Sequence, residues 1–250
     1  MAVIFGLVAC GSPPDRVIIA AGTTLVDSGF IEAVAGQYEV THPGIQLSVV
    51  GESSAQILNL GKSGTAQVLI THAPEQEAVF LADEHPRISK TVFSSAFVLV
   101  GPPGLADTLD GLTTAKAFAQ IADRRYGFVS RGDGSGTHEA ELNEWPRPGV
   151  APDGDWYIST GQGMGLSLQV ADQRGAFTLS ELGAFLGAEN LGHLVRVDLL
   201  DPPTNPYRIT VIESASPASL DFAEWLLGSD GQAAVGRVNE QIFGAVIYQP

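Results

Sequence analysis

The 250-residue sequence has one cysteine, Cys10, so no disulfide can form within the chain and the fold depends on its core alone. No apolar run reaches the roughly 20 residues that a membrane-spanning helix needs. Basic residues are also scarce: 13 lysines and arginines stand against 28 acidic residues, which gives a net charge of −15. This balance argues against a nucleic-acid partner, which needs a basic surface. The five histidines are scattered, so we expect no metal site.

The first nine residues are apolar without interruption, and Cys10-Gly11-Ser12 follows them. A short apolar segment that ends in small residues is typical of a secretory signal. Residues 7–10 also resemble a lipobox, the site at which bacterial lipoproteins are cleaved and lipidated on cysteine, although no lysine or arginine precedes Cys10. We therefore expect residues 1–16 to form a lipoprotein signal and tether, with lipidation at Cys10 and a periplasmic or extracytoplasmic, membrane-anchored protein. The alternative is a buried first strand with a chance cysteine.

Strand-like and helix-like patterns alternate in the first part of the chain. Apolar runs at residues 17–20, 45–50 and 68–70 indicate strands, and each is followed by apolar residues at helical spacing. This alternation predicts an α/β fold with a mostly parallel sheet. In such sheets, ligands bind where strands end and helices begin.

The same pattern restarts in the second part of the chain. The segments are a strand at 97–100, a strand at 126–129, helices from 138 and near 164–173, and a strand at 209–212. We interpret the strands at 97–100 and 209–212 as an exit from the first unit and a return to it. The sequence therefore predicts two α/β lobes joined by two crossings. The expected boundaries are 17–98 plus 206–250 for lobe 1 and 99–205 for lobe 2.

Residues 130–138, Ser-Arg-Gly-Asp-Gly-Ser-Gly-Thr-His, are the most informative stretch. The glycines let the backbone wrap closely around a ligand, and Arg131 adds a fixed positive charge with a planar fork of donors. A helical pattern follows, so the N–H groups of Gly136 and Thr137 would be free. A helix N-terminus with an arginine and hydroxyls is suited to hold a small oxyanion. The alternative is a glycine-rich surface turn that caps an ordinary helix.

Hydroxyl and amide donors recur at other expected turns. They are Thr23-Thr24, Ser53-Ser54 and Thr160-Gly161-Gln162-Gly163. No carboxylate–histidine pair accompanies them, which favours binding without catalysis. We expect Gly136 and Gly163 to tolerate no side chain if their N–H groups approach the ligand closely. Ser135 lacks the Gly-x-Ser-x-Gly spacing of a hydrolase nucleophile, but a secreted serine hydrolase that uses Ser135 is the alternative from another functional class.

With these residues the chain resembles the periplasmic tungstate-binding proteins of bacterial ABC importers, two-lobed solute-binding proteins related to the phosphate-binding ones. The resemblance covers nearly all of residues 17–248. The matching motifs are Thr23-Thr24 with Asp27-Ser28-Gly29, and residues 56–61, 66–75, 130–138 and 160–165. The resemblance implies a periplasmic-binding-protein-like fold with two crossover strands and a ligand cleft between the lobes.

The resemblance also implies the ligand and the residues that bind it. Tungstate would be captured for an ABC permease in the membrane, by a protein that is not an enzyme and has no cofactor; we expect a monomer. The residues lining the oxyanion site would be Thr23, Thr24, Ser54, Arg131, Ser135, Gly136 and Thr137, with Thr160, Gly161, Gln162 and Gly163 close by.

Three positions depart from the family pattern and bear on selectivity. Leu25 stands where the family usually has another hydroxyl, Gly134 where it has a second aspartate, and Ser159 where it has glutamate. Molybdate, and then phosphate or sulfate, are therefore the alternative ligands. Related phosphate binders keep a cleft aspartate that accepts the proton of hydrogen phosphate, whereas the corresponding strand end here is Thr71-His72. A site made only of donors fits oxyanions that carry no proton at neutral pH.

Overall fold

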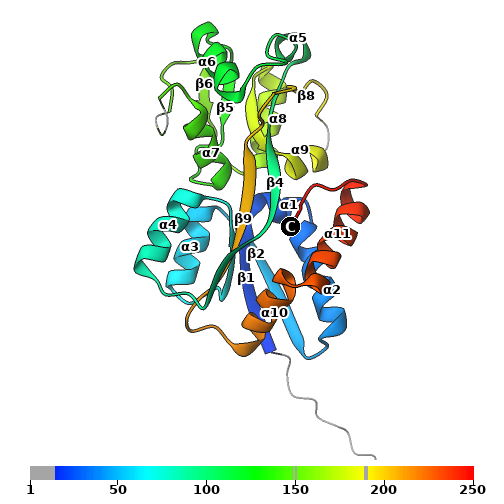
Figure 1. Cartoon of the computed structure of the whole chain (residues 1–250). Helices are drawn as coiled ribbons and strands as arrows, with labels where there is room; N and C mark the ends of the chain where they lie inside the picture. Colours follow the sequence, from blue (N-terminus) through cyan, green and yellow to red (C-terminus); the bar gives the residue numbers. More distant parts are fainter. Residues whose placement is uncertain (1–14, 148, 150, 189–190) are drawn as a thin grey trace, which may run out of the picture.

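The structure is a computed structural model that describes residues 15–147, 149, 151–188 and 191–250. These residues form two α/β lobes, one above the other in Figure 1. The expected signal, tether and lipidation site at Cys10 lie outside the described residues. In the part of the chain that the structure describes, no helix has the length and apolar character that crossing a membrane requires.

The first lobe is built on a parallel core of three strands. Strand β1 pairs in parallel with β2 on one side and with β3 on the other. Strands β1 and β3 end in uninterrupted buried stretches, as expected for parallel strands that helices cover on both faces. The elements of this lobe are β1 (Asp15–Gly22), α1 (Thr23–Asp27), α2 (Phe30–Thr41), β2 (Ile45–Glu52), α3 (Ser54–Lys62), β3 (Val68–Thr71), α4 (Pro74–Asp83), α10 (Pro217–Leu227) and α11 (Ser229–Phe243).

Two long antiparallel strands join the lobes, as the sequence predicts. Strand β4 (Ile88–Gly101) pairs with β9 (Thr204–Val211), from Ile88 opposite Val211 to Ala96 opposite Thr204. Strand β9 also lies beside β3, so the sheet order is β2-β1-β3-β9-β4-β7, where β7 (Thr178–Glu181), like β8 (Val195–Arg196), belongs to the second lobe. The last residues of β4 pair with β7 and β8 of the second lobe. One strand therefore leaves the first lobe and the other returns to it (Figure 1).

The second lobe has its own sheet and its own core. Strand β5 pairs in parallel with β6, and Phe128 of β5 bridges to Phe177, which precedes β7. Trp145 is buried and packs edge-on against the rings of Phe118 and Phe128. The elements are α5 (Pro103–Ala106), α6 (Thr114–Arg124), β5 (Phe128–Ser130), α7 (Gly136–Glu144), β6 (Tyr157–Ser159), α8 (Met164–Arg174), β7 (Thr178–Glu181), α9 (Leu182–Gly187) and β8 (Val195–Arg196).

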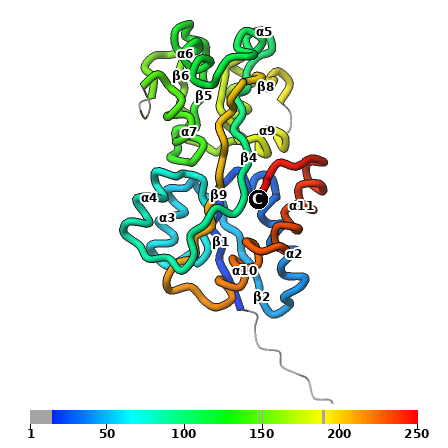
Figure 2. Tube along the Cα trace, in the orientation of Figure 1, coloured from blue at the N-terminus to red at the C-terminus, as the bar shows by residue number. Residues whose placement is uncertain are grey.

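The C-terminal segment returns to the region where the lobes join. After α11 the chain runs back to β4, where Gln249 forms a bridge with Ser94 (Figure 2). Tyr248 is buried and its hydroxyl donates to Glu181 Oε2 at 3.3 Å, at the end of β7 in the second lobe. The tail therefore packs against the crossover strands and contacts both lobes.

Candidate oxyanion-binding site

The glycine-rich loop of residues 131–135 connects the end of β5 to the start of α7, as the sequence predicts. Gly132 and Gly134 have left-handed φ angles of 62° and 71°, which side-chain-bearing residues rarely adopt. Ser135 caps α7, because its Oγ accepts a hydrogen bond from the His138 N–H at 3.2 Å. The loop therefore turns sharply and places the start of α7 at the boundary between the lobes.

The start of α7 and the loop before it pack directly on the first lobe. A Cβ added to Gly136 would overlap the carbonyl group of His72, at the end of β3. A Cβ added to Gly134 would lie 3.7 Å from the Cβ of Ala55, in the first turn of α3. The loop thus meets the carboxyl end of the parallel sheet, where ligands bind in folds of this kind. Figure 1 shows α7 opposite α3 and α4.

Arg131 lies in this loop and is only 2% exposed. Its Nε and Nη2 donate to Asp133 Oδ2 at 3.2 and 2.6 Å. Nη2 also donates to Thr23 Oγ1 of the first lobe at 3.0 Å. Nη1 is buried and has no hydrogen-bond partner among the described residues. One edge of the guanidinium is therefore held by the protein, while Nη1 remains for an acceptor from outside it.

Asp133 fixes the position of Arg131 and is a site residue beyond those predicted from the sequence. Burial would raise the pKa of this carboxyl, but the Arg131 charge and hydrogen bonds from Ser135 and Arg131 outweigh burial and hold the pKa below its ordinary value. The Ser135 N–H donates to Asp133 Oδ1 at 3.1 Å. A signal for this role exists in the sequence, because an aspartate two residues before a turn amide commonly accepts from it.

Three side-chain donors at this site are buried without an acceptor. They are Arg131 Nη1, Thr137 Oγ1 at the start of α7, and Ser54 Oγ at the start of α3. An unsatisfied buried polar group costs about 1–3 kcal/mol. An oxyanion that accepts hydrogen bonds from all three would remove this cost. In the described chain the other unpartnered buried atoms are Ser130 Oγ, which ends β5, and Tyr38 Oη and Gln232 Oε1 in helices of the first lobe.

The remaining predicted hydroxyls already take part in hydrogen bonds. Thr23 Oγ1 accepts from Arg131, and Ser135 Oγ accepts from the His138 N–H, so both keep a proton to donate. Thr24 Oγ1 lies 3.1 Å from the Tyr207 hydroxyl. These hydroxyls therefore hold neighbouring segments of the candidate site in place.

Thr160 supports the loop from behind. Its Oγ1 lies 3.2 Å from both the Ser130 and Arg131 carbonyl oxygens and 2.9 Å from Ser167 Oγ. The next two residues, Gly161 and Gln162, are exposed. Gly163 precedes α8, and a Cβ added there would meet no heavy atom of the protein within 4 Å. The expectation that a ligand approaches Gly163 too closely for a side chain stays a prediction.

His72 lies at the end of β3, beside the loop, and is a structural residue. It is buried, and Asn205 Nδ2 donates to Ser95 Oγ, so Asn205 Oδ1 accepts the His72 Nδ1–H at 2.9 Å. Burial lowers the pKa of His72 to about 4, with the Asn205 hydrogen bond opposing the shift. The ring is therefore neutral near pH 7 and adds no charge to the site.

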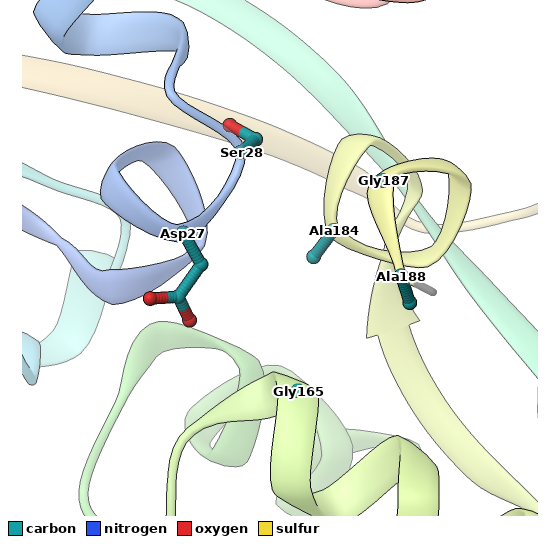
Figure 3. A pocket seen from close by; sticks show the side chains of 6 residues that line it. All are labelled: Asp27, Ser28, Gly165, Ala184, Gly187 and Ala188. Carbon is teal, nitrogen blue, oxygen red and sulfur yellow. The ribbon is translucent and has the colours of Figure 1, made fainter. Parts of the chain in front are cut away.

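A pocket of about 140 Å³ lies between the lobes on the other side of α1. It is lined by Asp27, Ser28, Gly165, Ala184, Gly187 and Ala188 (Figure 3). The Asp27 carboxylate points toward α8 in this view, and burial raises its pKa while Arg131 opposes the shift. The small side chains and single carboxylate of this pocket do not suit an anion. Within the described residues no group of three or more His, Cys, Asp or Glu side chains could hold a metal ion.

The described residues form two α/β lobes, and three buried side-chain donors without acceptors lie in elements that meet between these lobes. Residues 10–230 match the family model described as a PBP superfamily domain, and the chain belongs to this superfamily. The two-lobed periplasmic-binding-protein-like fold expected from the sequence is thereby confirmed.

Individual proteins and solved structures are also similar to this chain. The chain is 31% identical over 245 residues to a protein named tungstate-binding protein TupA from Peptoclostridium acidaminophilum, covering 94% of this chain and 85% of that one. A solved structure described as the tungstate ABC transporter from Geobacter sulfurreducens is 29% identical, with a TM-score of 0.80 over 90% of this chain and all of that one. TupA from Desulfovibrio alaskensis G20 shares the fold, with a TM-score of 0.76 at 24% identity over 94% of this chain and 98% of that one.

Proposed function

We propose that the protein is an extracytoplasmic solute-binding protein that captures tungstate between its lobes and delivers it to an ABC permease. The observation that supports this most directly is the set of three buried donors without acceptors, on Ser54 of one lobe and on Arg131 and Thr137 of the other. Tetrahedral oxyanions offer four acceptor oxygens and match such a set. The names of the related proteins favour tungstate within this class.

The proposed ligand shell comes from both lobes. Thr23, Thr24 and Ser54 belong to the first lobe; Arg131, Ser135, Gly136 and Thr137 belong to the second; Thr160, Gly161, Gln162 and Gly163 form the wall behind them. Arg131 supplies the fixed countercharge, and the hydroxyls and the first amides of α7 supply neutral donors. The proposed lobe boundaries are 17–98 plus 206–250 and 99–205, and we propose a monomer.

The acceptors near the site are already occupied, and this favours unprotonated ions. Asp133 already accepts two hydrogen bonds from Arg131 and one from the Ser135 amide, which makes this carboxylate a weaker acceptor for the proton of hydrogen phosphate. Leaving that hydroxyl unpaired costs about 1–3 kcal/mol, or roughly tenfold to a hundredfold in affinity. Molybdate, with nearly the same size and shape as tungstate, is the alternative ligand, followed by sulfate and phosphate.

Calorimetric competition among tungstate, molybdate, sulfate and phosphate tests the proposal. We expect tungstate to bind most tightly and phosphate to bind at least tenfold more weakly, as the missing acceptor implies. Equal affinity for phosphate and tungstate would contradict the selectivity, and no binding of any of the four would contradict the function.

Ser135 is not arranged as a nucleophile, which supports binding over hydrolysis. Its Oγ accepts from the His138 backbone amide, and the His138 ring faces elsewhere, since its Nδ1 pairs with the Gly134 N–H at 3.1 Å. A serine nucleophile needs a base hydrogen-bonded to its hydroxyl. We therefore propose that the protein is not an enzyme; hydrolysis of generic acyl or phosphate esters that Ser135→Ala abolishes would establish the serine hydrolase instead.

We also propose that the mature protein is anchored to the membrane through lipidated Cys10. The support is the apolar segment before this cysteine and the relation to proteins of ABC importers. Cys10→Ser should then release the protein from the membrane fraction. Finding the wild-type protein wholly soluble, with residues 1–9 intact, would contradict the anchor.

A further inference from the structure

Helix α4 of the first lobe has no side-chain cap of its own. Its N-cap residue is Ala73, and Pro74 follows it. The first amides of a helix need acceptors from outside the helix. The Ala73 N–H donates to Glu77 Oε1 at 3.1 Å, within the same lobe, and Pro74 has no N–H. The Glu75 N–H is therefore the first amide of α4 that needs an acceptor.

That acceptor comes from the second lobe. The Glu75 N–H donates to Glu139 Oε1 at 2.9 Å, and Glu139 lies in the first turn of α7. Serine, threonine or aspartate at the N-cap usually provides this hydrogen bond from the same chain segment. Here a carboxylate 64 positions along the chain provides it across the boundary between the lobes. The negative charge of Glu139 also lies at the positive end of the α4 dipole.

Further hydrogen bonds complete the contact between the two helices. Gln76 Nε2 donates to Glu139 Oε2 and to the Gly134 carbonyl, both at 3.1 Å. Asn143 Nδ2, one turn further along α7, donates to Glu75 Oε1 at 3.1 Å. Gly134 belongs to the glycine-rich loop that holds Arg131. The contact between α4 and α7 is therefore continuous with the candidate oxyanion site.

Separating the lobes would break all these hydrogen bonds together. The α4 amide would lose its cap, and Glu139 and Gln76 would return to water. Glu139 holds two groups of α4, because one of its oxygens accepts from the Glu75 amide and the other from the Gln76 side chain. None of these groups belongs to the proposed ligand shell, so their effect on a ligand would act through the position of the lobes.

We propose that Glu139 is a positioning residue for closure: by capping α4 from the opposite lobe, it shifts the protein toward the closed arrangement and thereby raises oxyanion affinity without contacting the ion. The expected change in oxyanion affinity rests on the proposed function, whereas the capping of α4 by Glu139 does not. A population shift of this kind raises affinity by the same factor for every ligand that binds only the closed arrangement.

The test compares Glu139→Ala with Glu144→Ala in the otherwise unchanged chain. Glu144 is the control because it lies on the same helix, and in the described residues its side chain makes no hydrogen bond. Amide exchange at Glu75 is measured without ligand, and tungstate affinity by calorimetry. We expect Glu139→Ala to speed exchange at Glu75 and to weaken tungstate binding by roughly threefold to thirtyfold, the loss typical of a helix cap. Glu144→Ala should change neither.

Gln76→Ala provides a second variant that approaches the contact from the other lobe. If Glu139 acts through Gln76 and the α4 start, the effects of Glu139→Ala and Gln76→Ala on affinity should be less than additive in a double-mutant cycle. Unchanged exchange at Glu75 and unchanged affinity in Glu139→Ala would overturn the inference. If exchange increases but the wild-type protein binds no tetrahedral oxyanion, the capping role stands and the proposed function fails.

Discussion

At the scale of single residues, the Arg131 guanidinium has two separate tasks. Nε and Nη2 are fixed by Asp133 and Thr23, so the side chain has little freedom left to lose when a ligand binds. Nη1 is buried and unpartnered within the described structure. A lysine could not perform both tasks, because its ammonium is a point charge without a planar fork.

Arg131→Ala should weaken oxyanion binding by roughly 2–5 kcal/mol, because a desolvated dianion would lose its fixed countercharge and Asp133 would be left unpaired. Arg174→Ala is the matched control, since Arg174 is an exposed arginine of the same lobe. Calorimetric titration with tungstate measures both variants. An unchanged affinity in Arg131→Ala would place the site elsewhere.

His72 makes stability depend on pH. Its pKa is about 4 in the folded protein against an ordinary 6.5, since burial disfavours the imidazolium. Below pH 6.5 the unfolded chain gains a proton that the folded chain does not, so the folded state loses up to about 3 kcal/mol as the pH falls from 6.5 to 4. Above pH 6.5 the imidazole is neutral in both the folded and the unfolded state, so the stability of the folded state is free of this loss. Denaturant unfolding at pH 7 and pH 5 should show a smaller pH effect in His72→Gln than in wild type; an identical difference would contradict the assignment.

At the scale of elements, the start of α7 depends on Gly136 having no side chain. A Cβ there would lie 2.7 Å from the His72 carbonyl carbon and would overlap its oxygen, both backbone atoms that cannot rotate away. Gly136→Ala should therefore push α7 off the end of β3 and weaken tungstate binding by about 1–3 kcal/mol, the cost of overpacking. Calorimetry with tungstate measures this loss.

Gly104→Ala is the matched control for Gly136→Ala. Gly104 also lies in the first turn of a helix of the second lobe, belongs to no part of the proposed ligand shell, and has open space where its Cβ would be. The tungstate affinity of this control variant should stay near the wild-type value. If both alanine variants bind normally, the close approach of α7 to β3 is not needed for binding.

The periodic patterns predicted most elements, because each reflects local burial. The three apolar runs of the first lobe are strands β1 to β3, and the predicted helix near 164–173 is α8 at Met164–Arg174. The crossover strands were predicted too short. Ile88–Gly101 is one strand, yet only its last residues form an apolar run, and β9 begins at Thr204 with an Asn-Pro pair that is typical of a loop.

Part of the candidate site was predictable because its residues are neighbours in the sequence. Glycines, hydroxyls and Arg131 follow one another in a short segment, so their chemistry is visible in the sequence. The contacts between lobes are not local: Arg131 and Thr23 are 108 positions apart, and Glu139 and Glu75 are 64 apart. No periodicity links such residues, so the role of Glu139 emerges only from the folded arrangement, whereas that of Asp133 has a local signal.

At the scale of the whole molecule, β4 and β9 are the covalent connections through which the lobes can move. They run side by side between separate cores, while α1, α4, α7 and α8 meet across the boundary through side chains and helix ends. Two rigid bodies joined by paired strands can open and close as a hinge. The loop that holds Arg131 lies against the first turn of α3, where Ser54 is, so the two donors belong to facing elements of the two lobes.

Tungstate should therefore shift the molecule toward the closed arrangement, because only that arrangement brings donors of both lobes to one ion. Small-angle scattering should show a smaller radius of gyration at saturating tungstate than without it. Arg131→Ala should show no such decrease at the same concentration, since it lacks the charge that couples the ion to the second lobe. Glu139→Ala should still contract, but at a higher tungstate concentration, because closing then proceeds without the α4 cap. Identical scattering of the wild-type protein with and without tungstate would mean that the lobes form one rigid body.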